Sequence, residues 1–140
     1  MHITSETISY SDTRDISLEA IRELYVVNGW SAAKKPTALR NGLLNSHSLW
    51  TAWDGDRLIG LGNAISDGHL VVYYPHLLVH PDYQRRGIGS ALMRRLMSMY
   101  EGFHQHILVA DGEAINFYNK LGFERAGKTQ SMWIYSGDDH

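Results

Sequence analysis

The sequence contains no cysteine and only three prolines among its 140 residues. Without cysteine the chain cannot form disulfide bonds, thiolate metal ligands or a cysteine nucleophile. It also lacks any apolar run near the roughly 20 residues that span a bilayer, and the polar residues 1–6 do not read as a secretion signal. We therefore expect a cytoplasmic protein that does not insert into membranes.

The chain also has no large excess of positive or negative charge, because its 13 lysines and arginines nearly balance its 15 aspartates and glutamates. The net charge of −2 gives no basic surface of the kind that binds nucleic acid or an anionic membrane, so neither partner is expected. The length suits one sheet covered by helices. No repeat, linker or low-complexity segment interrupts it, and we expect a single domain over residues 1–140.

Residues 77–90 combine the features of an anion site. An apolar strand leads through a polar loop into a helix whose start carries Gly87 and Gly89. Because glycine has no side chain, a phosphate can approach the N–H groups of the first helical turn. The helix dipole and the charges of Arg85 and Arg86 favour an anion at the same point. The stretch therefore predicts a pyrophosphate site.

Hydrophobic periodicity and turn residues predict the other elements. Strands are expected at residues 3–10, 48–53, 57–66, 70–79, 105–110, 123–125 and 130–135. Helices are expected to begin after Ser17, at Pro36, at Ile88 and after Asp111, and to end at Asn28-Gly29, after Leu44, near Tyr100 and at Gly122. A strand, a helix and another strand in succession imply one parallel pair in an otherwise antiparallel sheet. Pro75 cannot donate to a ladder and so indicates a bulge or an edge.

Two motifs stand in a fixed order along the chain. Residues 84–89 read Gln-Arg-Arg-Gly-Ile-Gly, and residues 117–123 read Phe-Tyr-Asn-Lys-Leu-Gly-Phe. Together they resemble the signature of the GNAT superfamily of acetyl-coenzyme A (acetyl-CoA)-dependent N-acyltransferases, and Leu24–Trp30 is similar to a stretch of its small bacterial members. The resemblance implies an α/β (α+β) fold. Its mixed, mostly antiparallel sheet would have six to seven strands, a splayed parallel central pair and about four flanking helices.

The resemblance also implies where acetyl-CoA binds. Its pyrophosphate would occupy the loop and the helix start, and its pantetheine arm would pair with the splayed strand, mostly through backbone N–H groups. The residues that match the family's contacts are Leu78, Val79, Gln84, Arg85, Arg86, Gly87, Ile88, Gly89 and Ser90, with Asn116 expected to hold a pantetheine amide.

Acyl transfer from a thioester to an amine requires a stabilised oxyanion and a proton for the departing thiolate. By resemblance, a backbone N–H near Leu78 polarises the thioester carbonyl and Tyr118 protonates the sulfur. A phenol with a pKa of about 10 stays protonated at neutral pH and can donate to a thiolate whose thiol has a pKa of about 8.5. Because no cysteine can carry the acetyl group, we expect direct attack in a ternary complex.

The acceptor side has fewer signals. By resemblance the first helices wall this pocket, and its candidate residues are Tyr25, Trp30, Asp67, Tyr73, His76 and Trp133. As the base, His76 has a suitable reference pKa, but its odd spacing from Tyr73 places it on the opposite face unless a bulge at Pro75 resets the alternation. Tyr73 is a poor base at neutral pH, and a water relay is the third alternative.

Three functions therefore stay open. The chain could acetylate a primary amine of a small molecule, acetylate a protein N-terminus or lysine, or bind acyl-CoA without catalysis. No metal is expected, because His76 and His80 are four residues apart on a segment that prolines keep extended. The apolar residues 132–135 could serve a homodimer interface or form a covered edge.

Overall fold

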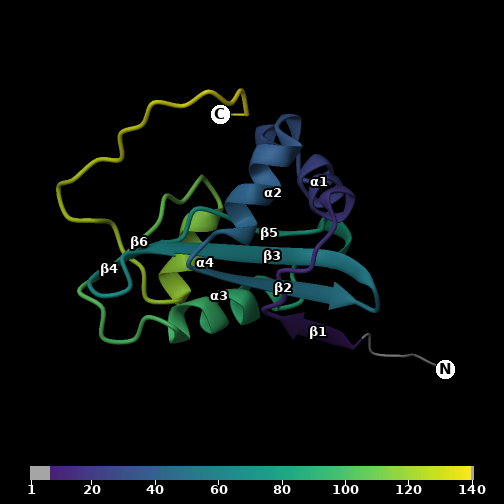
Figure 1. Cartoon of the computed structure of the whole chain (residues 1–140). Helices are drawn as coiled ribbons and strands as arrows, with labels where there is room; N and C mark the ends of the chain where they lie inside the picture. Colours follow the sequence, from purple (N-terminus) through teal and green to yellow (C-terminus); the bar gives the residue numbers. More distant parts are fainter. Residues whose placement is uncertain (1–6, 140) are drawn as a thin grey trace.

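The computed structural model describes residues 7–139 and consists of one sheet with helices on both faces (Figure 1). The strands are β1 (Ile8–Ser11), β2 (Ser48–Asp54), β3 (Arg57–Ser66), β4 (Val71–Tyr73), β5 (Leu77–Val79) and β6 (Gln105–Ile107). The helices are α1 (Leu18–Val27), α2 (Pro36–Leu44), α3 (Ile88–Ser98) and α4 (Ala114–Lys120), with short 3-10 helices η1 (Ser31–Lys34) and η2 (Pro81–Tyr83).

The six strands form a sheet of order β1-β2-β3-β4-β6, and β5 pairs with β3 beside this path. The β4–β6 pair is parallel and every other described pair is antiparallel. This confirms the predicted mixed sheet and its single parallel pair. The strand predicted at residues 3–10 is described only from residue 7 onward, and its residues 3–6 lie outside the described part.

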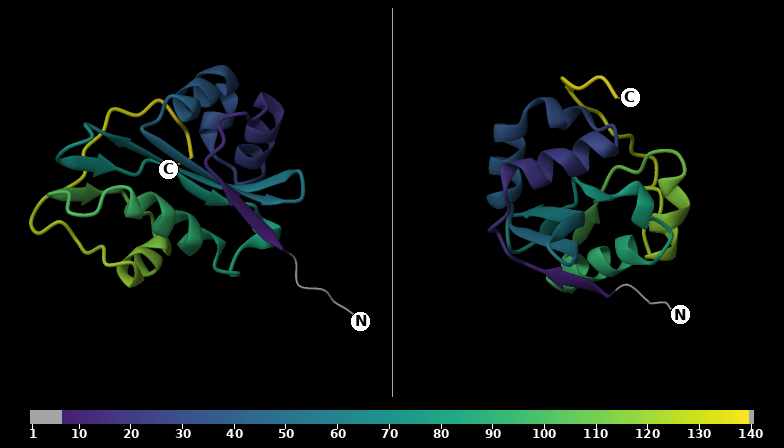
Figure 2. Two further views of the ribbon diagram at one scale, coloured as in Figure 1. Left: turned by 60° about the horizontal axis from the view of Figure 1, so that its bottom comes forward. Right: turned by 90° about the vertical axis from the view of Figure 1, so that its right-hand side faces the viewer.

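Helices α1 and α2 cover one face of the sheet, and α3 and α4 cover the other (Figure 2). The first face packs Leu24 and Leu43 onto Leu61. On the second face Leu92 packs against Ala52 and Ile59, because the apolar residues of α3 recur at helical spacing. Each face therefore buries a separate layer of apolar side chains, and the two layers hold the sheet between them.

The predicted helix boundaries are largely confirmed. The Ser17 hydroxyl accepts a hydrogen bond from the Ala20 N–H and so caps α1. Pro36 is the first residue of α2, where its missing N–H leaves no helical bond unmade. Asp111 was wrongly predicted as the cap of α4, which begins at Ala114 after Glu113 and has no side-chain cap bond.

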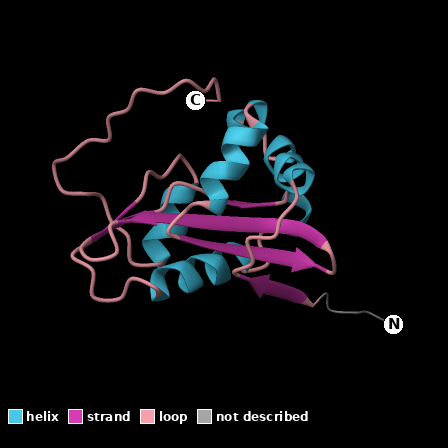
Figure 3. Ribbon diagram, viewed as in Figure 1, coloured by secondary structure: helices cyan, strands magenta, loops and turns pink. Residues whose placement is uncertain are grey.

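Other boundaries differ from the prediction. The expected strand 70–79 is interrupted between β4 and β5, where Pro75 cannot donate to a ladder. Strands at residues 123–125 and 130–135 are wrong, since the structure describes this tail as loop (Figure 3). The Phe123 N–H bonds to the Tyr118 carbonyl, and Asp139 accepts hydrogen bonds from both the N–H and the hydroxyl of Ser31. These attachments hold the tail in an arch above the sheet, and it joins no strand ladder (Figure 1).

Two glycines of β3 set the distance between the sheet and α3. A Cβ on Gly62 would lie 2.9 Å from Leu96 Cδ1 and 3.1 Å from Leu77 Cδ1. Distances this short would force the core side chains to shift. Gly60 is similar, with Leu92 Cδ1 at 3.3 Å. The absence of side chains at these positions allows α3 to pack directly on the strand.

We expect Gly62→Ala to lower the free energy of unfolding by about 1–3 kcal/mol, the usual cost of overpacking a core. The matched control is Gly42→Ala in α2, where a Cβ would meet nothing within 4 Å. Because alanine is the better helix former, that variant should gain about 0.5–1 kcal/mol. Urea denaturation of the three proteins checks both signs, and equal stabilities would contradict the close packing of α3.

None of the helices within residues 7–139 is both long enough and apolar enough to cross a membrane.

Candidate active site

Within residues 7–139, the edge of β5 that faces away from β3 has no strand partner. Antiparallel pairing with β3 runs from Leu77 opposite Gly62 to Val79 opposite Gly60. The parallel pair β4–β6 ends one residue past β4, where the Tyr74 N–H bonds to the Ile107 carbonyl. Beyond that point, among the described strands, β5 pairs only with β3. The predicted splaying of the parallel pair is therefore present, and it begins at the break around Pro75.

Ladder alternation decides which backbone groups point into this gap. The His76 carbonyl accepts from the Asn63 N–H and the His80 N–H donates to the Ile59 carbonyl, so residues 76 and 80 face β3. Leu78 is in phase with both and also directs its N–H and carbonyl toward β3, whereas Leu77 and Val79 direct theirs into the gap. The Leu78 N–H therefore does not point into the gap, and the donors on this edge are the N–H groups of Leu77 and Val79. The Gln84 side chain already donates to the Val79 carbonyl, at 3.0 Å.

Tyr83 anchors the loop that follows β5. It is 7% exposed, its hydroxyl donates to the Asp54 carboxylate, and this hydrogen bond raises its pKa. The guanidinium carbons of Arg57 and Arg86 lie 5.8 and 5.4 Å from its ring centre, within the range of cation–π attraction. This tyrosine ties the predicted phosphate loop to the hairpin between β2 and β3.

The loop enters α3 through an unusual backbone. Arg85 has φ +65° and is the one non-glycine residue with positive φ in the described chain. Gly87 follows with φ +80° as the residue before α3, and a Cβ there would meet nothing within 4 Å. A left-handed backbone costs other residues about 1–2 kcal/mol, so Gly87 is required for its conformation. No side chain caps α3, and its first turn contains no acidic residue, which leaves this helix end suited to an anion.

Gly89 serves a different purpose, because it lies where α3 meets α4. A Cβ on Gly89 would be 3.4 Å from Phe117 Cζ and 3.6 Å from Cε1 of the same ring. The two glycines predicted to make room for a phosphate thus divide the work. Gly87 turns the chain, and Gly89 lies in contact with the Phe117 ring of α4, where a methyl group fits but a larger side chain would meet the ring. Gln84, Arg85 and Arg86 are exposed on this loop, while Ile88 is buried and Ser90 is half-buried.

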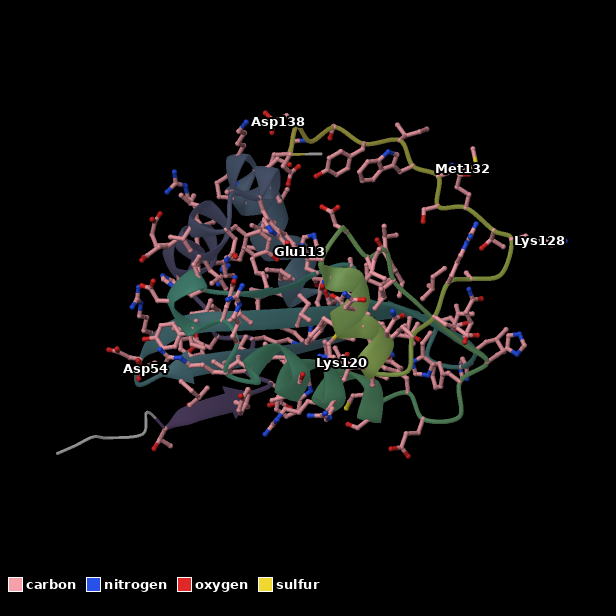
Figure 4. The ribbon with its side chains drawn as sticks, turned by 180° about the vertical axis from the view of Figure 1, so that it is seen from behind. Asp54, Glu113, Lys120, Lys128, Met132 and Asp138 are labelled. Carbon is pink, nitrogen blue, oxygen red and sulfur yellow. The ribbon has the colours of Figure 1, made fainter. Side chains whose placement is uncertain are left out.

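Tyr118 lies on α4 and packs into the apolar layer under α3. Its ring makes edge contacts with Phe117 and Phe123, at centroid distances of 5.0 and 5.9 Å. Burial raises the pKa of Tyr118 to about 12, so the phenol keeps its proton over the physiological range. No hydrogen-bond partner for its hydroxyl is found within residues 7–139. Asn116 lies two residues earlier on the same helix and is exposed. Figure 4 shows α4, which begins after the labelled Glu113 and ends at the labelled Lys120.

Three of the predicted acceptor residues come together on the other face of the sheet. The Tyr25 hydroxyl lies 2.7 Å from His76 Nδ1. Trp30 meets both rings edge-on, at 5.6 Å from Tyr25 and 5.2 Å from His76. Tyr25 is fully buried, and burial raises its pKa far above the usual value. Burial also lowers the pKa of His76 to about 4, so its imidazole is neutral at physiological pH.

The chain break at Pro75 explains the position of His76. Val72 and Tyr74 pack under α3, so Tyr73 faces the opposite side. His76 contacts Tyr25 of α1 and therefore lies on that same side despite its odd spacing from Tyr73. Strict alternation would place it on the other face. The break resets the alternation, as the sequence analysis allowed.

The remaining acceptor candidates are not part of this aromatic cluster. Asp67 is exposed and its Oδ1 accepts from the N–H groups of residues 69, 70 and 71. These bonds lower the pKa of Asp67 to about 2, and they explain the residue as the cap of a turn. Tyr73 is 39% exposed on β4. Trp133 lies on the tail, stacked on Tyr135 at 4.3 Å.

The sequence model of the acetyltransferase (GNAT) domain matches residues 45–125, more than half of the chain. The chain belongs to the GNAT family of acetyltransferases. It is similar to the soybean (Glycine max) protein named histone acetyltransferase TAP1, with 30% identity over 133 residues that cover 86% of this chain and 58% of that protein. The chain therefore spans less than two thirds of this relative.

Solved structures show the same fold. A GNAT family acetyltransferase of Streptococcus pneumoniae is 32% identical, with a TM-score of 0.77 over 92% of this chain and 97% of its own. An aminoglycoside N-acetyltransferase solved in complex with CoA has a TM-score of 0.69 over 97% of this chain and 98% of its own. Its identity of 17% shows likeness of fold alone. The chain therefore belongs to the GNAT family and shares its fold.

Two residues that position the GNAT site were missed by the sequence reasoning. Tyr83 is one, and its signal was an aromatic residue within an otherwise polar loop. Asn63 is the other: it is 5% exposed on β3 and bonds the His76 backbone from both its own N–H and its Oδ1. A buried asparagine on an apolar strand indicates a polar group that needs a partner, but the sequence does not identify that partner.

The side chains that could bind a metal ion are scattered over the described residues. Within residues 7–139, no three or more histidine, aspartate or glutamate side chains gather closely enough to hold an ion. His80 is engaged otherwise, with Nδ1 3.0 Å from the Asp82 N–H donor and Nε2 3.1 Å from Arg57 Nη2.

Proposed function

We propose that this GNAT protein transfers the acetyl group of acetyl-CoA to a primary amine of a small molecule, by direct attack in a ternary complex. The observation that carries the proposal is the unpaired edge of β5, which leads through the loop into the uncapped start of α3. Backbone groups without a partner require another one. An extended arm that carries amides and ends in a diphosphate supplies partners to the β5 edge and to the start of α3.

The diphosphate end of the cofactor fits the start of α3. Gly87 directs the first-turn N–H groups outward, and the helix dipole favours negative charge there. Arg85 and Arg86 are exposed beside this turn and add two positive charges. Gln84, Ile88, Gly89 and Ser90 complete the contacts that we assign to the pyrophosphate.

The pantetheine arm fits along β5 in the direction opposite to the chain. Val79, nearer the phosphate loop, presents its backbone N–H for an amide of the arm, and Asn116 of α4 is exposed to meet a second amide. The Leu77 N–H, farther from the loop, is then placed to polarise the thioester carbonyl. This replaces the N–H of Leu78, which the ladder directs toward β3.

The chemical step needs a proton for the leaving thiolate. Tyr118 holds its proton, since burial raises its pKa to about 12. Because a free thiol has a pKa of about 8.5, below that of Tyr118, the phenol stabilises the departing thiolate by donating a hydrogen bond to it. Any proton that Tyr118 gives to the sulfur is replaced by the proton that the acetylated amine releases. The acceptor amine approaches from the side of Tyr25, Trp30 and His76, which lie at the end of β5 remote from the phosphate loop.

Two measurements test the proposal on the whole chain. Calorimetry with CoA and with acetyl-CoA should show saturable heat for both, and the absence of heat with either would remove the cofactor from the site. Release of free thiol from acetyl-CoA should then depend on an amine, measured across small amines, peptides with a free N-terminus and lysine peptides. Binding without release would indicate a CoA-binding protein that does not catalyse. Release with peptides alone would identify a protein acetyltransferase.

A further inference from the structure

His76 is held more firmly than a residue that merely fills the core. Its backbone N–H donates to Asn63 Oδ1 at 3.1 Å, and its carbonyl accepts from the Asn63 N–H at 3.1 Å. Asn63 is fixed in turn, because its Nδ2 donates to the buried Ser46 hydroxyl at 2.9 Å. These two hydrogen bonds between Asn63 and the His76 backbone lie at the chain break before β5. They therefore fix the position from which the His76 ring projects.

The two ring nitrogens of His76 have different surroundings. Nδ1 lies 2.7 Å from the Tyr25 hydroxyl. No partner for Nε2 is found in the described part of the chain. Trp30 closes one side of the ring, edge-on at 5.2 Å. The imidazole is therefore a mostly buried group with one satisfied nitrogen and one that awaits a partner.

The hydrogen of the Tyr25 hydroxyl decides the tautomer. This side chain is fully buried, and over residues 7–139 its hydroxyl has His76 Nδ1 as its sole hydrogen-bond partner. If Nδ1 carried the proton and donated to Tyr25, the hydroxyl hydrogen would be buried without an acceptor, which is costly. Tyr25 therefore donates to Nδ1. A neutral imidazole then carries its proton on Nε2.

We propose that His76 presents a neutral Nε2–H donor to an oxygen of the acceptor molecule, and that Tyr25 fixes the tautomer that makes this possible. The inference rests on the proposed function and deepens it, because it excludes His76 as the general base. An Nε2 that carries a proton has no lone pair to accept one from the amine. The attacking amine must then lose its proton to water.

His76 stays neutral over the pH range in which the protein would work. Burial lowers its pKa to about 4, and the charged group that opposes this effect is Asp139 of the tail. From α1 the ring faces Tyr25, whose hydroxyl stays neutral because burial raises its pKa. From the segment before η1 it faces the uncharged Trp30. The donor is therefore present, unchanged, at every pH from about 5 upward.

The direct test is nitrogen-15 NMR of the histidine rings in the whole protein, with His76→Gln used to assign the signals. We expect the pattern of a neutral ring protonated at Nε2 in the wild type, and loss of that preference in Tyr25→Phe. Tyr10→Phe, at the opposite edge of the sheet on β1, should leave the His76 signals unchanged. A ring protonated at Nδ1 in the wild type would overturn the inference without any activity measurement.

The kinetic test compares two substitutions on the best amine of the panel. Glutamine places an N–H donor near the position of Nε2 but cannot act as a base, whereas leucine does neither. We expect His76→Gln to keep kcat/KM within about 3-fold and His76→Leu to lose about 10-fold, the usual effect of one hydrogen bond, mostly through KM. Equal losses in both variants, together with a pH profile that flattens in both, would identify His76 as a base and overturn the inference.

The two tests also separate this inference from the proposed function. If CoA binds and the ring carries its proton on Nε2, but no amine releases thiol, the proposed acetyl transfer fails and the tautomer stands. If amines are acetylated but the ring carries its proton on Nδ1, the proposed function stands and the role of His76 is wrong.

Discussion

Replacing Tyr118 with phenylalanine should lower kcat by about 100-fold or more, the usual contribution of a positioned general acid. The substitution removes the hydroxyl and keeps the ring, so the edge contacts with Phe117 and Phe123 remain. Because no partner for that hydroxyl is found within residues 7–139, its loss breaks no described hydrogen bond. The effect should therefore appear in turnover, with the affinity for acetyl-CoA and the melting temperature nearly unchanged.

The pH dependence gives this prediction a second check. Burial raises the pKa of Tyr118 to about 12, so the phenol loses its proton only as the pH approaches that value. The wild type should show no loss of kcat from this group below a pH of about 11. Thiol release measured from pH 6 to 10 in both proteins tests this, with Tyr10→Phe as the control. Equal turnover of Tyr118→Phe and wild type at every pH would remove Tyr118 from the chemistry.

Replacing Gly89 with leucine should weaken CoA binding by about 100-fold. A Cβ at this position already lies at contact distance from the Phe117 ring, 3.4 Å from Cζ, and the further atoms of leucine would meet the same ring. The free protein can relieve the strain by moving α4 away from α3. We expect binding to require the original spacing, and overpacking costs about 1–3 kcal/mol, or about 5–150-fold in Kd.

Gly89→Ala is the matched control for this prediction. Its Cβ makes an ordinary van der Waals contact with Phe117, so calorimetry should show an affinity within a few-fold of the wild type. A similar loss in both variants would show that any side chain at position 89 obstructs the phosphate. The spacing of the two helices would then not be the cause.

The tail shows why part of the fold lies outside the reach of sequence reasoning. Residues 132–135 are apolar and were predicted to form a strand, yet Ile134 and Met132 are almost fully exposed. The residues that follow this segment attach to η1. There Asp139 binds Ser31, and Asp138 forms an ion pair with Lys34. Propensity describes the segment itself and carries no information about where its last residues attach.

The cofactor side of the site was predictable because its determinants are local. The glycines and arginines of residues 84–89 and the helical spacing of the apolar residues of α3 can both be read within residues 77–99, whereas the left-handed backbone of Gly87 is seen only in the structure. Local reading did not show that the Leu78 N–H is directed toward β3, because the phase of β5 is set by its ladder to β3.

The sequence by itself determined the GNAT motifs, the mixed sheet with its parallel pair and the helix start that suits a diphosphate. The helix start and each motif depend on residues within one or two turns of each other, where sterics and periodicity act directly. The parallel pair follows from the order of strand, helix and strand along the chain. Only the tertiary structure decided how His76 is used. Tyr25 lies 51 residues before it, and a hydrogen bond between side chains so far apart in the chain exists only after the sheet and α1 have packed together.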